Sequence, residues 1–305
     1  MFDENKTRSQ KFSKLLADND FTKNEIGVAI IDLNEPEPKI FGYNMEHFIY
    51  PASVYKVFVG AEMLRRVEIG DFSLDQIVEI KSPNDVDKDA RIFPGDTRKL
   101  LSSSDKVSIE HLLDLMLTRS DNTASNSLID IVGRENIVKN IIHKYNWQGS
   151  EVTRKFLDRI KEDKPYQFSG TTLTCARHLV EFFYLVEKEK LVSSFVSTKL
   201  KGYMLRFSRQ GKKGLWLENL YQEYYCKGGW LETNLWKHNF LSLCKAIYKK
   251  GWAVIRWSND VGVVTGKKSK YVIALLTINK SVSPTNYFPI QKFAKVVFDF
   301  MENTN

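Results

Sequence analysis

The chain has 305 residues and a formal net charge of +8 at pH 7. This length is enough to bury a full hydrophobic core, either as one large domain or as two closely packed ones. Lysine and arginine are interspersed with aspartate and glutamate along most of the chain, and we find no RNA- or DNA-binding motif, so we expect no nucleic-acid partner. The positive charge could instead attract the protein to an anionic surface, such as cell-wall polymers or lipid headgroups.

The composition does not support metal chemistry or a membrane-spanning segment. The three cysteines are odd in number and have no metal-binding spacing, so they imply no disulfide framework. The five histidines form no His-x-x-x-His pair, and we expect no metal and no organic cofactor. No run of about 18 apolar residues exists, and the first residues lack a basic segment followed by an apolar core. We therefore expect a cytoplasmic protein as written, or a periplasmic or secreted one if a signal was removed.

The N-terminal segment predicts one helix followed by two strands. Residues 7–19 have the apolar spacing of an amphipathic helix. Residues 26–32 form an apolar run typical of a buried strand, and residues 39–43 form a second strand after a turn that contains two prolines. Two strands joined by so short a loop predict an antiparallel hairpin.

A serine and a lysine lie three residues apart at the start of the next predicted helix. Ser53 and Lys56 would lie on the same side of that helix, one turn from each other. The apolar residues between 57 and 64 recur at helical spacing, which indicates that the helix is buried. A desolvated lysine beside a hydroxyl can accept its proton. The same spacing recurs at 103/106 and 242/245, so other motifs must decide whether it has a chemical role.

The middle of the chain, from about residue 58 to 200, is mostly helical in pattern. Residues 108–117 predict a helix that Ser108 caps. A polar turn at 120–122 interrupts it, and a helix then restarts over 126–132 and ends at Gly133. Residues 172–188 predict a further amphipathic helix.

Strand patterns return after about residue 205. Residues 223–226 and 260–264 predict strands, and 271–277 predicts a third, joined to the second by a hairpin turn. Residues 290–301 predict a closing amphipathic helix. The segment 231–257 is interpreted as an insertion with a helix or a strand-helix excursion at about 239–248, which would form a lid, a partner surface or mere decoration.

Strands at both ends of the chain with helices between them predict an α+β fold. One antiparallel sheet would be built from the two chain ends and flanked by the terminal helices, with an all-helical lobe inserted. We expect residues 1–57 and 205–305 to form the sheet-containing lobe, residues 58–204 to form the helical one, and an active-site cleft to lie between them.

Two further motifs follow Ser53-x-x-Lys56 at suitable intervals, namely Ser120-Asp121-Asn122 and Lys227-Gly228-Gly229. This set resembles the Ser-x-x-Lys, Ser-Asp-Asn and Lys-Thr-Gly motifs of class A β-lactamases and penicillin-binding proteins. The resemblance covers roughly residues 25 to 300 and implies the β-lactamase/transpeptidase-like fold. A glycine replaces the usual threonine in the third motif.

The resemblance implies roles for the first two motifs. Ser53 would attack a carbonyl and form an acyl-enzyme, and Lys56 would take its proton. Lys56 could also be a structural ammonium bonded to Ser120 and Asn122, and both roles can hold at once. Ser120 would relay a proton to the leaving nitrogen, and Asn122 would bind the substrate amide. The alternative for this motif is an ordinary helix-capping turn, in which Asp121 is the structural member.

The third motif would complete the site. Lys227 would present a positive charge to a substrate carboxylate, or it is an edge-strand lysine that discourages aggregation. Gly228 and Gly229 would let a substrate backbone approach the strand. The backbone N–H groups of Ser53 and Trp230 would form the oxyanion hole. The missing threonine hydroxyl weakens the grip on a carboxylate, and Trp230 would narrow the cleft or stack on a ligand.

The segment from 150 to 172 departs most from the resembled family. Class A β-lactamases carry a Glu-x-Glu-Leu-Asn loop that holds the deacylating water, and this chain lacks it. Between residues 160 and 167, Glu162 is the one glutamate, and we interpret it as a surface charge or as a weak candidate base. Without a positioned water the acyl-enzyme should persist, since a general base typically contributes about 10²–10⁴-fold.

Four functions therefore stay open for this sequence. The first is a serine hydrolase that acylates β-lactams and turns them over slowly. The second is a hydrolase of D-Ala-D-Ala-like peptides or esters. The third is a catalytically silent binding module of the same fold, and the fourth is a basic protein that engages an anionic partner.

Overall fold

The structure is a computed structural model. It describes residues 4–87, 96–210, 214–235, 247 and 250–304. The chain divides into two compact units, which we call the sheet unit and the helical unit. The sheet unit comprises Met1–Val54, Thr174–Tyr184 and Lys212–Asn305, and the helical unit comprises Tyr55–Leu173 and Leu185–Gly211.

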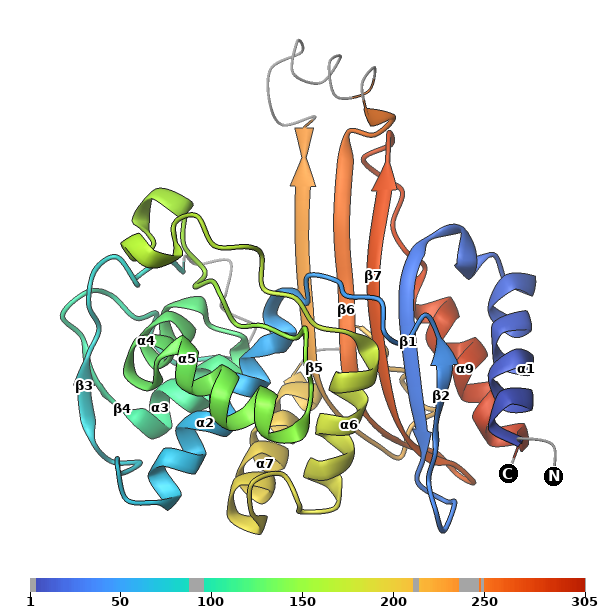
Figure 1. The fold of residues 1–305 in the computed structure, drawn as a ribbon, viewed down its shortest axis with the longest axis horizontal. Coiled ribbons are helices and arrows are strands. Elements are labelled where there is room, and N and C mark those ends of the chain that lie inside the picture. The colour runs from blue at the N-terminus through green and yellow to red at the C-terminus, as the bar shows by residue number, and fades with distance from the viewer. Residues whose placement is uncertain (1–3, 88–95, 211–213, 236–246, 248–249, 305) are drawn as a thin grey trace. The chain divides into compact units, whose positions relative to one another are not determined.

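The sheet unit is built around one antiparallel sheet with the order β2-β1-β7-β6-β5 (Figure 1). Its strands are β1 (Glu25–Asp32), β2 (Ile40–Tyr43), β5 (Glu223–Asn234), β6 (Val254–Thr265) and β7 (Lys270–Ser281). The predicted hairpins β1–β2 and β6–β7 are both confirmed. Because β1 pairs with β7, the first and last strands of the chain lie side by side, which confirms that one sheet joins both chain ends.

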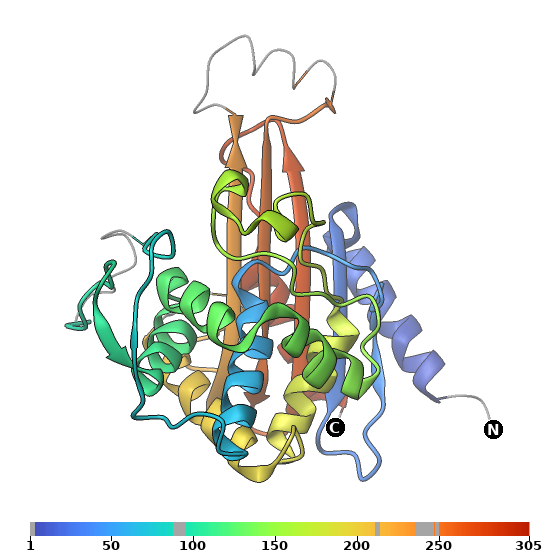
Figure 2. The ribbon, with the colours of Figure 1, turned by 60° about the vertical axis from the view of Figure 1, so that its left-hand side comes forward.

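The terminal helices α1 (Glu4–Asp18) and α9 (Ile290–Thr304) pack side by side against this sheet (Figures 1 and 2). The Phe12 ring of α1 lies 5.8 Å from that of Phe41 on β2 and 5.6 Å from that of Phe300 on α9. Phe12 and Phe41 are fully buried. Burying a side chain of this size stabilises the fold by roughly 1.5–3 kcal/mol, so the periodicity that predicted these helices reflects a real core. A short 3-10 turn, η1 (Phe21–Lys23), joins α1 to β1.

The helix α6 (Ala176–Glu187) starts four residues later than its sequence pattern predicts. Thr174 forms an antiparallel bridge with Ile49, and this long-range pairing keeps the backbone before Ala176 extended. Within the sheet unit, the Phe183 ring of α6 stacks on that of Tyr225 of β5 at 6.1 Å.

The helical unit is organised around α2 (Lys56–Glu68), whose residues from Lys56 to Leu64 are all buried. Gly60 sits where a Cβ atom would come within 3.3 Å of side chains from Leu117 and Leu200, so the helices approach closely there. Among the described residues of this unit, the other helical elements are α3 (Ile109–Asp114), η4 (Leu115–Arg119), α4 (Asn122–Val132), α5 (Arg134–Ile137), η5 (Val138–Ile142), η6 (His143–Tyr145), η7 (Arg159–Lys161), η8 (Lys164–Tyr166) and α7 (Ser194–Gln210).

Two details of the helical unit differ from the sequence-based prediction. The strands β3 (Ile77–Glu79) and β4 (Lys106–Ser108) form a small antiparallel sheet within the stretch whose pattern is mostly helical. The helix α4 begins at Asn122 rather than at 126, because the 120–122 turn is its N-terminus and not a separate interruption. The cap at Ser108 is confirmed, since its hydroxyl accepts a hydrogen bond from the His111 N–H at 3.1 Å. The helix end at Gly133 is also confirmed, and this glycine has a positive φ of 78°.

The predicted insertion at 231–257 is extended at both ends. The pairing of β5 with β6 continues in register from Leu231↔Trp257 to Asn234↔Val254. The prediction placed the strand of β6 over 260–264 and thus missed its first six residues. The helix expected at 239–248 lies almost wholly outside the described residues. In the described part of the chain, no helix combines the length and apolar character needed to cross a membrane.

Candidate active site

Ser53 lies in η2 (Ala52–Tyr55), a 3-10 turn that runs directly into α2. In such a turn, side chains three residues apart lie on the same side. Ser53 is 7% exposed. Ala52, which precedes it, has a φ of +49°, in the left-handed region that residues with a Cβ rarely adopt. Backbone strain of this kind often marks a functional position.

The strand β5 approaches the backbone of Ser53 at Gly229. A Cβ atom at position 229 would lie 2.7 Å from the Ser53 nitrogen and 2.8 Å from the Val54 nitrogen. A side chain therefore cannot fit there, and glycine is required for this close approach. On β6, Asn259 is paired with Gly229, and its side-chain amide donates to the Tyr50 carbonyl at 3.0 Å. These contacts bring the 228–230 backbone next to the segment that carries Ser53.

The side chain of Trp230 covers Gly228. A Cβ atom at position 228 would lie 2.8 Å from the Trp230 Cζ2 atom, so the indole occupies the space that a side chain at 228 would need. The two residues lie on the same face of β5, because side chains alternate along a strand. Trp230 is 41% exposed. A threonine at position 228 would clash with the Trp230 indole, so the glycine at 228 makes room for the large residue at 230.

Lys227 is fully buried, although β5 is an edge strand. Its Nζ donates a hydrogen bond to the Gly228 carbonyl at 2.8 Å. The interpretation of Lys227 as an exposed lysine that protects a sheet edge is therefore wrong, because such a residue would reach into solvent.

In the helical unit, Lys56 holds the Ser120-Asp121-Asn122 turn. Its fully buried ammonium donates to the Ser120 carbonyl and to the Asn122 Oδ1, both at 2.7 Å. The Ser120 hydroxyl lies 3.3 Å and the Asp121 carbonyl 3.4 Å from the same nitrogen. Lys56 of the first motif thus contacts all three residues of the second motif, although the two motifs are far apart in the sequence. The structural role predicted for Lys56 is present in these bonds.

Asp121 is the structural member of the turn, as predicted. Its side chain accepts from the Ala124 N–H at 2.8 Å, which caps α4, and forms an ion pair with Arg119 at 2.9 Å. Both side chains of this pair are fully buried. Ser120 has a φ of +59°, so the turn also holds a strained backbone position.

An aromatic side chain that the sequence analysis did not single out lies over Lys56. The Phe156 ring centroid is 4.2 Å from the Lys56 Nζ, a cation–π geometry, and the ring stacks on Tyr55 at 5.1 Å with an interplanar angle of 3°. The Asn126 Oδ1 accepts from the Phe156 N–H at 2.7 Å, and the Tyr55 hydroxyl donates to the Arg154 carbonyl at 2.8 Å. The 154–156 segment is therefore fixed to the helices that carry the first two motifs.

Glu162 is buried, with 3% of its surface exposed, so its interpretation as a surface charge is wrong. One carboxylate oxygen pairs with Arg134 at 2.7 Å, and the other accepts from the Lys155 N–H at 2.8 Å. Arg134 also pairs with Asp163 at 3.1 Å. Both oxygens of Glu162 are thus used to hold the loop together.

A second buried carboxylate, Asp260, lies behind β5. Its Oδ2 accepts from the Leu215 N–H at 2.8 Å and from the Tyr224 hydroxyl at 2.9 Å, while its Oδ1 is buried with no hydrogen-bond partner among the described residues. Burial raises the pKa of Asp260 to about 6, although these two hydrogen bonds oppose the rise. Gly214, at φ +75°, lies so close that a Cβ atom there would clash with the carboxylate.

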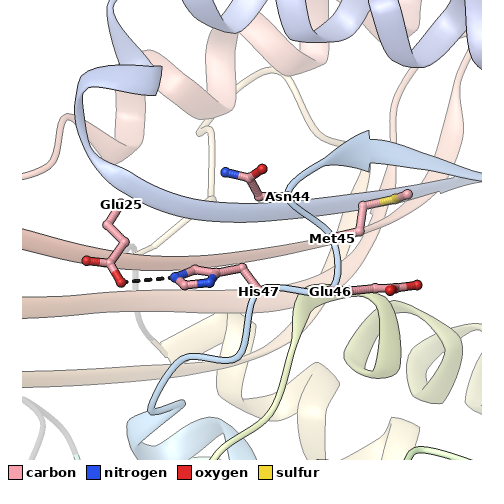
Figure 3. A pocket seen from close by; sticks show the side chains of 5 residues that line it. All are labelled: Glu25, Asn44, Met45, Glu46 and His47. Carbon is pink, nitrogen blue, oxygen red and sulfur yellow. Dashed lines mark hydrogen bonds and ion pairs between the residues drawn. The ribbon is translucent and has the colours of Figure 1, made fainter.

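Two cavities lie apart from the predicted site residues. One, of about 590 Å³ in the sheet unit, is lined by Glu25 and by residues 44–47 (Figure 3). In it, burial alone would raise the pKa of Glu25, but hydrogen bonds with His47 and Lys280 lower it below its usual range. The other, of about 390 Å³ in the helical unit, lies beside α4. None of the predicted site residues lines either cavity.

Proteins of known structure share this fold over nearly the full length of the chain. The TLA-1 extended-spectrum β-lactamase superposes with a TM-score of 0.70 at 20% identity, over 98% of this chain and 99% of that one. A class A β-lactamase from Bacteroides cellulosilyticus gives 0.70 at 20% identity over 97% and 98%. PBP-A gives 0.67 at 14% identity, over 95% of both chains. At these identities the likeness establishes a shared fold.

The family follows from the sequence itself. A sequence model of the beta-lactamase enzyme family matches residues 7–301, and the chain therefore belongs to this family. Membership implies a small-molecule substrate. Among curated proteins, none matches the sequence at a significant level.

Proposed function

We propose that the protein is a serine hydrolase that forms an acyl-enzyme on Ser53. Lys56 accepts the Ser53 proton as the oxygen attacks the substrate carbonyl. The carbonyl carbon gains a bond to the Ser53 oxygen and loses its bond to the leaving nitrogen, which Ser120 protonates while Lys56 returns the proton to Ser120. Asn122 binds the substrate amide, and Lys227 supplies positive charge.

The contact of Lys56 with the Ser120–Asn122 turn is the observation that carries the proposal. A neutral Lys56 amine keeps two N–H donors for the two nearest of its four acceptors, those at 2.7 Å, and has one lone pair. That lone pair can accept the proton of Ser53, three residues earlier on the same helical stretch. This role requires Lys56 to be neutral when Ser53 attacks, so its ammonium must first lose a proton.

The approach of β5 to Ser53 supports an oxyanion hole beside this serine. An oxyanion hole needs two N–H donors that point to one developing negative charge. Gly229 has no side chain to separate the Ser53 backbone from the strand, and Trp230 is the next residue. We assign the N–H groups of Ser53 and Trp230 to this role.

Efficient deacylation is not supported by the loop that follows residue 150. The carboxylate of Glu162 is engaged by Arg134 and by the Lys155 N–H, so it is a poor candidate base. The side chain that the loop directs to Lys56 is the apolar Phe156. A long-lived acyl-enzyme follows, and this favours a second candidate function, in which the natural substrate is a D-Ala-D-Ala-like peptide or an ester.

Labelling with a fluorescent penicillin, followed by mass analysis of the intact and digested protein, tests the proposal. We expect one covalent adduct at Ser53 and none in Ser53→Ala. Ser127→Ala is a matched control, because this serine is 6% exposed, similar to the 7% of Ser53, and lies outside the predicted site. Absence of an adduct with every β-lactam and activated ester tried would reject the proposal. Nitrocefin hydrolysis then measures turnover.

A further inference from the structure

The Gly228–Trp230 pair changes the chemistry of the β5 edge beside Ser53. In Lys-Thr-Gly motifs a threonine hydroxyl stands at the position of Gly228. Here the indole fills that space, with Cζ2 2.8 Å from where a Cβ atom at 228 would lie. A hydroxyl that could donate to an anionic group is thus replaced by an apolar ring surface that is 41% exposed.

The opposite face of the same strand end is apolar as well. Leu231, which follows Trp230, is 44% exposed and is paired with Trp257 on β6. The Trp257 ring packs edge-on against Tyr50 at 6.0 Å, and Tyr50 is three residues before Ser53. Apolar groups therefore flank the β5 edge on both faces directly after Gly229.

The remaining cation of the motif is not presented by an exposed side chain. Lys227 is fully buried, and its Nζ donates to the Gly228 carbonyl. A substrate carboxylate that binds at this edge would lose bound water. It would contact the indole at the place where a Lys-Thr-Gly motif provides a hydroxyl donor. Burying a charge without hydrogen-bond partners is unfavourable, whereas aromatic and apolar groups gain by contact with an indole.

We propose that Trp230 is a specificity-determining residue that selects substrates with a neutral, apolar group beside the scissile bond over substrates with a carboxylate there. The inference rests on the proposed function, because it assumes that the substrate carbonyl is bound between Ser53 and Trp230. Of the two substrates named in the second candidate function, it favours the neutral ester over the D-Ala-D-Ala-like peptide, whose terminal carboxylate would meet the indole.

Penicillin G and its methyl ester form a matched pair of probes, because they differ only in whether the carboxylate is free and charged or methylated and neutral. We would measure their binding to the Ser53→Ala protein by calorimetry, so that no acylation is needed. The methyl ester should bind more tightly. Trp230→Ala should weaken its binding roughly 2- to 10-fold, the value of one aromatic contact. Val282→Ala, which trims a side chain that is likewise 44% exposed at the end of β7, should leave the ratio unchanged.

The double variant Gly228→Thr/Trp230→Ala tests the exchange directly, since it removes the indole and restores the hydroxyl. We expect it to reverse the preference and to bind penicillin G at least about tenfold more tightly relative to the ester, the value of one hydrogen bond to a charged group. An unchanged ratio in Trp230→Ala, or binding of neither probe, would overturn the role of Trp230. Absence of an adduct in the native protein would instead count against the proposed function.

Discussion

Phe156 offers a direct test of why the acyl-enzyme should persist. Its ring centroid lies 4.2 Å from the Lys56 Nζ, and its backbone is held by Asn126 at 2.7 Å. Phe156→Glu would keep this backbone position and put a carboxylate within reach of the ammonium. Such a carboxylate could hold and deprotonate a water molecule for attack on the acyl group.

The expected gain is large compared with the structural cost. A positioned general base accelerates a reaction by about 10²–10⁴-fold, so deacylation should accelerate by a factor in this range. The substitution loses the stack on Tyr55, about 0.5–1.5 kcal/mol, and the cation–π contact, up to about 2 kcal/mol. A new ion pair with Lys56 offsets part of this loss, which stays well below the stability of 5–15 kcal/mol typical of a folded protein.

The assay follows the decay of the Ser53 penicillin adduct by mass spectrometry after excess reagent is removed. Phe156→Gln is the matched control, because it has the same size and reach as the glutamate but cannot act as a base. The adduct should decay in Phe156→Glu and persist in both Phe156→Gln and the native protein. Equal decay in the Glu and Gln variants would refute the reasoning, since loss of the ring alone would then explain any change.

Two predictions concern buried carboxylates. Asp121→Asn should lower the free energy of unfolding by about 1.5–3 kcal/mol, the value of a hydrogen bond to a charged group, because Arg119 would keep Asp96, at 3.6 Å, as its charged partner. Asp121→Ala should cost about 1 kcal/mol more through the lost cap. Urea unfolding measures both, and native-like stability of the Asn variant would contradict the buried ion pair. Burial raises the pKa of Asp260 from 3.8 to about 6, so the folded protein binds this proton more tightly than the unfolded chain does. The protonated carboxyl therefore contributes to the free energy of unfolding below pH 4, and this contribution is lost as the pH rises towards 6. Asp260→Asn should therefore gain stability relative to the native protein by up to roughly 3 kcal/mol between pH 4 and pH 7, and a difference that does not change with pH would show that Asp260 titrates normally.

Local sequence signals predicted much of the fold, because they depend on neighbouring residues. The apolar run at 26–32 and the alternating turn and strand signals after 260 identified the strands β1, β6 and β7. The helix cap at Ser108 and the stop at Gly133 are likewise short-range effects. Element ends were less accurate. The start of α6 is fixed by a bridge between Thr174 and Ile49, which no local pattern contains.

The same division applies to the candidate site. The three motifs identified the residues to examine, and the polar composition of the 120–122 turn identified Asp121 as its structural member. The ring over Lys56 was missed, because nothing near Phe156 in the sequence indicates a partner a hundred positions away. A signal did exist for Asn126, since it belongs to the motif sequence around Ser120, but its bond to the Phe156 N–H is visible only in the fold.

The sequence by itself determined the order of the main-sheet strands and the terminal helices, the three motifs and the absence of the usual deacylation loop, since all of these are properties of chain order and residue type. Only the tertiary structure decided that Glu162 and Lys227 are buried and that Trp230 fills the space beside Gly228. The physical reason is that burial and ion pairing depend on which distant segments meet. A glutamate in a polar loop has the same local pattern whether it faces water or pairs with Arg134.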